Sequence, residues 1–256
     1  MVAQIGAGTH PDLPDMLVHF TGRPRTGEPP PFASGTPEQR LVRILRSGEL
    51  LASTTYGTTG PVACFSELSD AALQVLLTTG FTTRGPYLPW GILVYRERLL
   101  DAGAGPVWYM SNAELSATSD LPSAMKDRRV RFEPGHSDWL HEREWRLCWG
   151  VEEPTPARLP LADLLAGVVV GTQGWEAAPS VRTEAIRTTR GVGTKTFTRF
   201  AGITDRLPRF WWDDSTLRED GHFDVAAQMY AWDEARSDDA HEAARDFHFG
   251  SPGLPL

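Results

Sequence analysis

The sequence predicts an α+β domain, and three observations lead to this class. About six apolar, β-prone segments are distributed along the chain, and two convincing helical segments lie between them. The order of these segments lacks the regular strand–helix alternation of a doubly wound fold. Finally, 256 residues with 41% hydrophobic and 23% charged side chains are enough to bury a substantial core.

The first strand and the first helix have the clearest local signals. Residues 1–15 are predicted to form a loose N-terminal arm, and residues 16–22 (MLVHFTG) a strand. The helix follows a loop rich in proline and glycine. Thr36 is its expected N-cap, Gln39 completes a capping box with it, and Gly48 is the stop signal. The remaining signals are Pro37 at the first helical position and an apolar face of Leu41, Ile44 and Leu45.

The later elements are assigned from apolar runs and turn residues. A second helix is expected from the Ser69 cap to the Gly80 stop. Residues 111–140 receive no assignment, and the acidic stretch 223–246 has helical composition but weak apolar periodicity. Further strands are expected at residues 61–68, 90–95, 106–110, 141–149 and 165–172.

Charge and composition exclude several functional classes. A formal net charge of −8 argues against a protein that coats nucleic acid, although brief contact through a local patch stays open. The densest basic run is interpreted as a solvated loop. It contains Lys126, Arg128, Arg129 and Arg131.

The two cysteines, Cys64 and Cys148, are expected to be small buried residues in a reducing compartment. Their spacing is not that of a metal site. The N-terminal residues do not resemble a signal peptide, and no apolar run approaches the ~18 residues of a membrane span. We therefore expect a cytoplasmic protein with no membrane association.

The common nucleotide and hydrolase motifs are absent from the sequence. There is no P-loop, Gly-x-Gly-x-x-Gly, Gly-x-Ser-x-Gly or His-Glu-x-x-His pattern. This absence argues against most nucleotide triphosphatases, Rossmann oxidoreductases, α/β-hydrolases and zincin proteases.

The stretch HEREWRLCWG, residues 141–150, places two carboxylates beside apolar residues. In a strand over 141–149, Glu142, Glu144, Arg146 and Cys148 would share one face, and Trp145 and Leu147 the other. The carboxylates would then lie about 6 to 7 Å apart. One interpretation is an ion-pair ladder between Glu144 and Arg146. The other is the floor of a site in which a carboxylate stabilises an oxocarbenium ion.

An ordered set of motifs resembles a bacterial abortive-phage-resistance (AbiGi-like) family. The set consists of LVHFTG, LVRILRSGEL, LAST, PVACFSELSD, YLPWGILVYRERLLDAGAGPVWYM and EREWRL, and it covers roughly residues 17–171. The first two motifs also resemble the start of DNA-targeting ADP-ribosyltransferase toxins from toxin–antitoxin pairs. The resemblance implies a split, mixed β-sheet like that of ADP-ribosyltransferases over residues 16–215, with an acidic C-terminal extension over residues 216–256.

The resemblance also implies a site for NAD, which is the substrate, and no metal. Glu144 would be the catalytic carboxylate, with Glu142 beside it, and His19 would hold the adenosine-side ribose. Three other residues would contact or support the nicotinamide end of the pocket, namely Thr21 and Gly22 through hydrogen bonds and Tyr56 through stacking. Ser66 would support the pocket. The family's catalytic arginine has no certain counterpart here, and the candidates are Arg23, Arg84 and Arg146.

The implied activity is NAD-dependent transfer of ADP-ribose to a macromolecular acceptor, protein or nucleic acid, in phage defence or a toxin–antitoxin pair. Two alternatives stay open. One is a non-catalytic interaction or neutralising module, whose acidic surface would bind a basic protein partner. The other is a metal-dependent nuclease, which would need a metal-compatible cluster of carboxylates.

Overall fold

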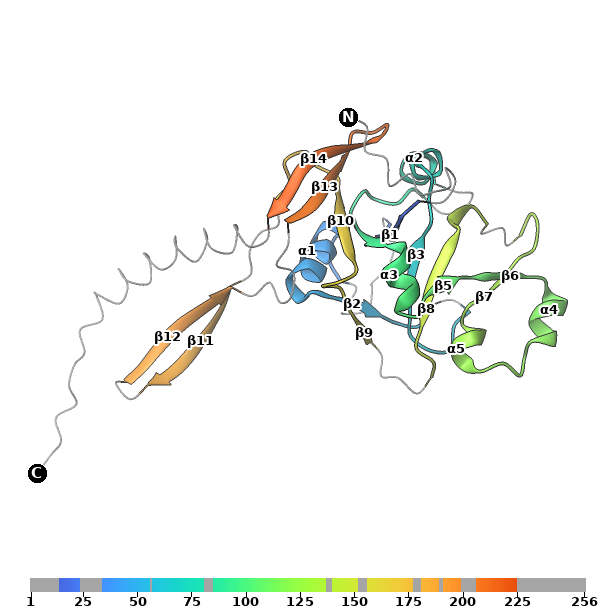
Figure 1. The fold of residues 1–256 in the computed structure, drawn as a ribbon, viewed down its shortest axis with the longest axis horizontal. Coiled ribbons are helices and arrows are strands. Elements are labelled where there is room, and N and C mark those ends of the chain that lie inside the picture. Colours follow the sequence, from blue (N-terminus) through green and yellow to red (C-terminus); the bar gives the residue numbers. More distant parts are fainter. Residues whose placement is uncertain are drawn as a thin grey trace, which may run out of the picture.

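An eight-stranded mixed sheet forms the centre of the protein (Figure 1). The structure is a computed structural model that describes residues 14–23, 34–55, 57–80, 85–136, 140–151, 156–176, 181–188, 191–198 and 206–224. The strand order is β14-β13-β10-β4-β1-β3-β8-β5, in which β10 and β13 are parallel and the other neighbours antiparallel. The strands are β1 (Met16–Phe20), β3 (Val62–Ser66), β4 (Gly91–Tyr95), β5 (Gly105–Pro106), β8 (Glu144–Cys148), β10 (Leu165–Val170), β13 (Arg206–Trp212) and β14 (Leu217–Asp224).

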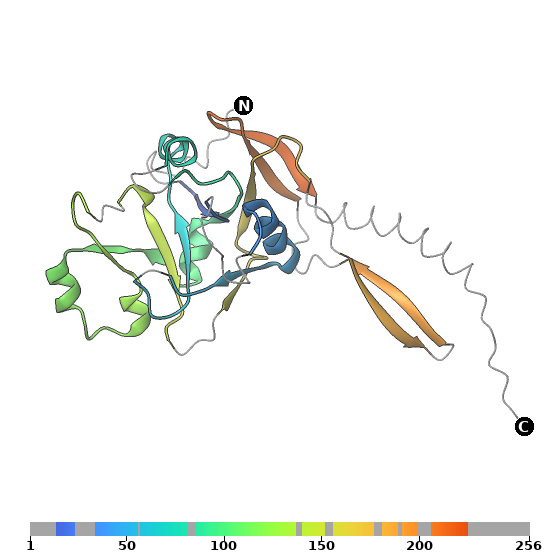
Figure 2. The same cartoon turned by 180° about the vertical axis from the view of Figure 1, so that it is seen from behind.

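Helices and two small two-stranded sheets lie around the central sheet, and a third pair, β11 (Val181–Thr188) with β12 (Gly191–Thr198), projects away from it (Figures 1 and 2). The described helices are α1 (Pro37–Ser47), α2 (Asp70–Thr78), α3 (Arg96–Asp101), α4 (Asn112–Ala117) and α5 (Ser123–Lys126). The two small sheets around the central sheet pair β2 (Glu49–Ala52) with β9 (Ala157–Pro160), and β6 (Trp108–Met110) with β7 (Arg129–Arg131). The α+β class predicted from the sequence is therefore confirmed.

The central sheet is nearly divided between β1 and β3. Strand β1 pairs with β4 at every position from Met16 to Phe20, but with β3 only at Val18 opposite Ser66. Strand β3 in turn pairs with β8 along its whole length. The sheet therefore consists of two well-paired parts that meet at a short seam.

Each face of the sheet packs against its own hydrophobic core. On one face, α1, α3 and the β2–β9 pair bury side chains such as Leu17 and Phe65. On the other face, α2 packs Leu73 and Leu76 against Val18 and its neighbours. Burial on both faces explains why β10 is a continuous apolar run.

Helix α1 forms as its local signals predict. Thr36 and Gln39 make the capping box, and Gly48 ends the helix with a left-handed φ of 67°. The helix buries Leu41 and Leu45, while Ile44 packs at the edge of the same core.

Glu142 does not belong to the strand that contains Glu144, so the strand predicted over 141–149 is wrong at its start. Leu140–Glu142 forms a 3-10 helix, and β8 begins only at Glu144. Arg143 has a φ of 40°, which breaks the extended backbone and the alternation of side chains between them. The two carboxylates are therefore positioned by different elements.

The segment without a sequence assignment, 111–140, contains α4, α5 and β7. Within it, Arg129 donates to the carbonyl oxygens of Leu115 and Thr118 at 3.0 and 2.7 Å, so its guanidinium satisfies the end of α4. Strand β14 lies beyond the boundary predicted at residue 215 and pairs with β13. Most of 223–246 lies outside the described residues. Within the described ranges, no helix is long and apolar enough to cross a bilayer.

Candidate functional site

Glu144, at the start of β8, is held by a two-pronged ion pair. Arg146 donates from Nε to one carboxylate oxygen at 2.8 Å and from its second terminal nitrogen to the other at 3.1 Å. The two side chains are only 11% and 7% exposed, respectively. As predicted, both residues lie on the face opposite Trp145 and Leu147, which are buried in the other core. A bidentate, largely desolvated pair fixes the carboxylate in position.

Glu142 reaches the same region from the 3-10 helix and pairs with Arg23. The Arg23 guanidinium donates to Glu142 at 2.9 Å, and these side chains are 15% and 13% exposed. The same guanidinium lies 3.8 Å from the centre of the Tyr87 ring, which stacks on Phe20 at 5.0 Å. Arg23 therefore lies between a carboxylate and an aromatic face.

Two tyrosine side chains complete this cluster, and the sequence did not predict either as a site residue. Burial, followed by the charge of Glu142, raises the pKa of Tyr87 well above its usual value. Burial raises the pKa of Tyr109 to about 12, and the charges of Glu144 and Glu142 act in the same direction. Both phenols are therefore neutral near pH 7. The Tyr109 oxygen also accepts a hydrogen bond from the backbone N–H of Glu144 at 3.2 Å.

Ser66 lies at the junction between this cluster and β1. Its backbone is in register with Val18 on one side and with Glu144 on the other. Residues in register share a face of the sheet, so Ser66 and Glu144 are brought together. Cys64 lies next along the same face of β3, opposite Arg146. Burial, and then the charge of Glu144, raises the pKa of its thiol, which is therefore protonated.

His19 lies on the opposite face of the sheet from Glu144. It follows Val18 on β1, and its ring is 5.7 Å from that of Phe65, which belongs to the other core. Its Nδ1 is 2.8 Å from the carbonyl oxygen of Cys64. Because a carbonyl can only accept, Nδ1 carries the proton. Burial lowers the pKa of His19, so the ring is neutral and Nε2 is a hydrogen-bond acceptor.

Thr21 and Gly22 make contacts within the fold. The Thr21 hydroxyl lies 2.7 Å from the carbonyl oxygen of Pro37 and 2.9 Å from that of Trp90, so its hydrogen is used there. Gly22 has a φ of 152°, and a side chain at this position would collide with the Arg40 guanidinium. These contacts hold the end of β1 against α1. They do not leave the Thr21 hydroxyl hydrogen for a nicotinamide amide.

Tyr56 and Arg84 lie outside the described residues. The structure therefore brings together Glu142, Glu144 and Ser66, with Arg23 and Arg146 from the arginine candidates, and places His19 on the opposite face of the sheet. Within the described ranges, no group of three or more His, Cys, Asp or Glu side chains is arranged to hold a metal ion.

Comparison with known proteins identifies no relative. No protein-family model, no curated protein and no solved structure matches this chain. Inference about its activity therefore depends on the geometry of the site and on the sequence resemblance.

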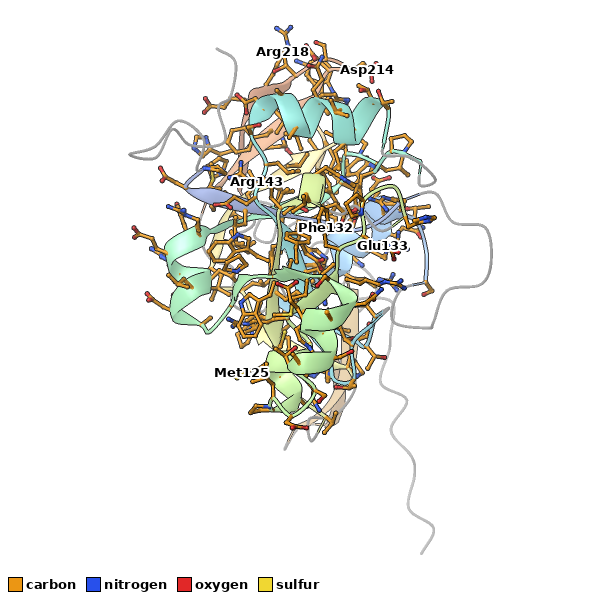
Figure 3. All side chains as sticks on the ribbon, turned by 90° about the vertical axis from the view of Figure 1, so that its right-hand side faces the viewer. Met125, Phe132, Glu133, Arg143, Asp214 and Arg218 are labelled. Carbon is orange, nitrogen blue, oxygen red and sulfur yellow. The ribbon has the colours of Figure 1, made fainter. Side chains whose placement is uncertain are left out.

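A second carboxylate cluster lies on the other face of β3 and β8. Glu67, which is 7% exposed, accepts from the Trp145 indole at 3.3 Å and from Arg96 at 3.5 Å. Arg143 lies 3.9 Å from the same carboxylate and is labelled in Figure 3. This cluster anchors the turn before β8, and so helps to fix the position of Glu144 at the start of that strand.

The cluster around Glu144 pairs each of its two carboxylates with an arginine. It combines these two ion pairs with the phenols of Tyr87 and Tyr109 in a region of low solvent exposure. Negative charge in such a region interacts strongly with a developing positive charge, because little water screens it. The arginines hold the carboxylates in place through these hydrogen bonds.

Proposed function

We propose that this protein is an NAD-dependent ADP-ribosyltransferase. The reaction breaks the bond between nicotinamide and the adjacent ribose and transfers ADP-ribose to a macromolecular acceptor. The observation that carries the proposal is that Glu144, with its bidentate Arg146, lies near Glu142 and is in register with Ser66, the β3 residue at the seam with β1.

The chemistry of NAD fits this set of residues. Its nicotinamide ring is cationic, and breaking the glycosidic bond creates an oxocarbenium-like ribose. Carboxylates stabilise the ribose cation in the transition state. Glu144 is the group that stabilises the ribose cation, and Glu142 orients the acceptor.

His19 contributes from the opposite face of the sheet. Its neutral ring presents Nε2 as an acceptor, which suits a ribose hydroxyl on the adenosine side of NAD. A dinucleotide that contacts both His19 and Glu144 therefore passes from one face of the sheet to the other, where β1 and β3 pair only once. Thr21 acts in this arrangement by holding the end of β1, and Gly22 by allowing Arg40 to approach.

The decisive experiment follows both products of the reaction. The protein is incubated with NAD labelled in the adenylate moiety and with a cell lysate, and released nicotinamide and acid-insoluble label are measured. Nicotinamide release with retained label supports transfer. Nicotinamide release without retained label supports hydrolysis instead. A folded protein that releases no nicotinamide refutes the enzymatic proposal and favours the interaction module.

A further inference from the structure

A buried aspartate outside the candidate site connects Arg146 to a distant turn. Asp127, which follows α5, is 1% exposed. One of its carboxylate oxygens accepts from the Thr59 backbone at 2.7 Å and from the Thr59 hydroxyl at 3.0 Å. The other accepts from the Gly60 backbone at 2.9 Å. A buried carboxylate is costly unless it is fully hydrogen-bonded, and here three donors satisfy it.

The backbone of Asp127 makes the contact that matters for the site. Its carbonyl oxygen accepts from Nη1 of Arg146 at 2.7 Å. The other two donor groups of this guanidinium hold Glu144. The position of the Arg146 guanidinium, and with it the Glu144 carboxylate, therefore depends on where the Asp127 carbonyl lies.

The turn that holds Asp127 is itself fixed. Gly60 packs so closely against the backbone of Gly150 that a side chain at residue 60 would collide with it. Thr59 and Gly60 therefore cannot shift toward the end of β8 to accommodate a different residue 127. The network runs from this turn through Asp127 and Arg146 to Glu144.

We propose that Asp127 is a positioning residue for Glu144, holding the Arg146 guanidinium in the orientation that presents the carboxylate. Its importance for turnover rests on the proposed function, but its effect on Arg146 does not. Asp127→Asn places an NH2 group opposite backbone N–H donors, and so displaces the Asp127 carbonyl. Thr59→Val removes one donor and is the milder variant.

Asp213 offers a matched control. Its carboxylate also accepts from a tight turn, through the Ser215 and Thr216 backbones at 3.1 and 2.8 Å. That turn, marked by Asp214 and Arg218 at the top of Figure 3, lies at the other end of the molecule from Met125 in α5. Asp213→Asn therefore removes the same kind of interaction without touching Arg146.

The first measurement does not need an active enzyme. The Nε–H of Arg146 is followed by nitrogen–proton NMR and assigned by its loss in Arg146→Lys. We expect its exchange with solvent to accelerate on the order of 10-fold or more in Asp127→Asn, less in Thr59→Val, and not in Asp213→Asn. Unchanged exchange in folded Asp127→Asn and Thr59→Val would overturn the proposal.

The second measurement uses NAD turnover. We expect kcat to fall on the order of 10- to 100-fold in Asp127→Asn with little change in KM, because a misplaced Glu144 weakens the transition state more than substrate binding. Faster exchange with an unchanged kcat would overturn the positioning role. If the native protein does not turn over NAD, the proposed function fails, and the exchange of Arg146 still decides whether Asp127 positions it.

Discussion

Arg146 offers two of its nitrogens to the two carboxylate oxygens of Glu144, two residues away on the same strand. Both side chains are almost completely shielded from water. Such a pair is expensive to desolvate, and it holds the Glu144 carboxylate in a fixed place. The same geometry is compatible with a purely structural ion pair and with a catalytic carboxylate, and mutation of Glu144 distinguishes the two.

Glu144→Gln should reduce the rate of NAD turnover on the order of 10²- to 10³-fold while NAD affinity is largely kept. Glutamine preserves the size of the side chain but removes the charge that stabilises the oxocarbenium ion, and its NH2 group cannot accept from Arg146. Loss of the charge also leaves Arg146 buried without its partner, which should cost about 3 to 5 kcal/mol of unfolding free energy. Turnover and the urea midpoint are measured on the same preparation.

Glu133→Gln is the control for this variant. Glu133 pairs with Arg131 in an exposed ion pair, with side chains 39% and 50% exposed, so its loss should change neither turnover nor the midpoint by much. If Glu144→Gln lowers the midpoint and leaves turnover intact, the pair is only structural.

Glu142→Gln should affect the fate of ADP-ribose more than the release of nicotinamide. The side chain can still accept from Arg23, but it no longer attracts the proton of an acceptor nucleophile. We expect label transfer to fall while free ADP-ribose accumulates, measured as the ratio of the two products. A parallel loss of both products, as in Glu144→Gln, would contradict the separate role of Glu142.

The stability of the protein should fall in mild acid because of His19. Burial lowers the pKa of His19 in the folded state, so below the unfolded value of 6.5 the unfolded chain binds the extra proton. Stability is full above pH 6.5 and declines as pH falls through the folded pKa. In His19→Asn, whose amide can still donate to Cys64, the urea midpoint should vary less between about pH 7.5 and 5.5.

His136 provides the comparison, because it is exposed. His136→Asn should reproduce the pH profile of the native protein. If His19→Asn also reproduces it, burial of the neutral ring does not contribute to acid sensitivity.

Tyr109 should produce the opposite behaviour in alkali. Its pKa rises from 10.0 to about 12 on folding, so the folded protein keeps a proton that the unfolded chain loses. Its stabilising effect is complete below about pH 10 and declines as pH rises through about 12. Tyr109→Phe should flatten the fall in urea midpoint above pH 10, whereas Tyr95→Phe, at a residue 40% exposed, should not. If the urea midpoint falls equally above pH 10 in the native protein, Tyr109→Phe and Tyr95→Phe, the alkaline effect does not come from Tyr109.

The sequence predicted the elements whose signals are local. The Thr36–Gln39 capping box and the Gly48 stop lie within one helix, so neighbouring residues are enough to recognise them. The turn before β8 was missed because it depends on a positive φ at Arg143, a residue type that does not mark such turns. Strand β13 was missed in part because Pro208 argues against a strand, and it is accommodated where the register with β14 shifts.

The candidate site was predicted in part. Glu144 and Arg146 are two residues apart on one strand, so alternation alone places them together. The contacts of Arg23 with Glu142 and Tyr87 join segments far apart in the chain, and no local pattern encodes them. Asp127 lies within a basic run and was not recognised from the sequence. Its burial depends on the distant turn that contains Thr59 and Gly60.

The short seam between β1 and β3 has a consequence for how the protein moves. Cooperative opening follows hydrogen-bonded units, and only one register pair joins the unit containing β4 and β1 to the unit containing β3 and β8. We expect native-state hydrogen exchange to resolve two units of different protection with their boundary at Val18 and Ser66. A molecule bound across that boundary would couple them, and amides in both units would become protected together.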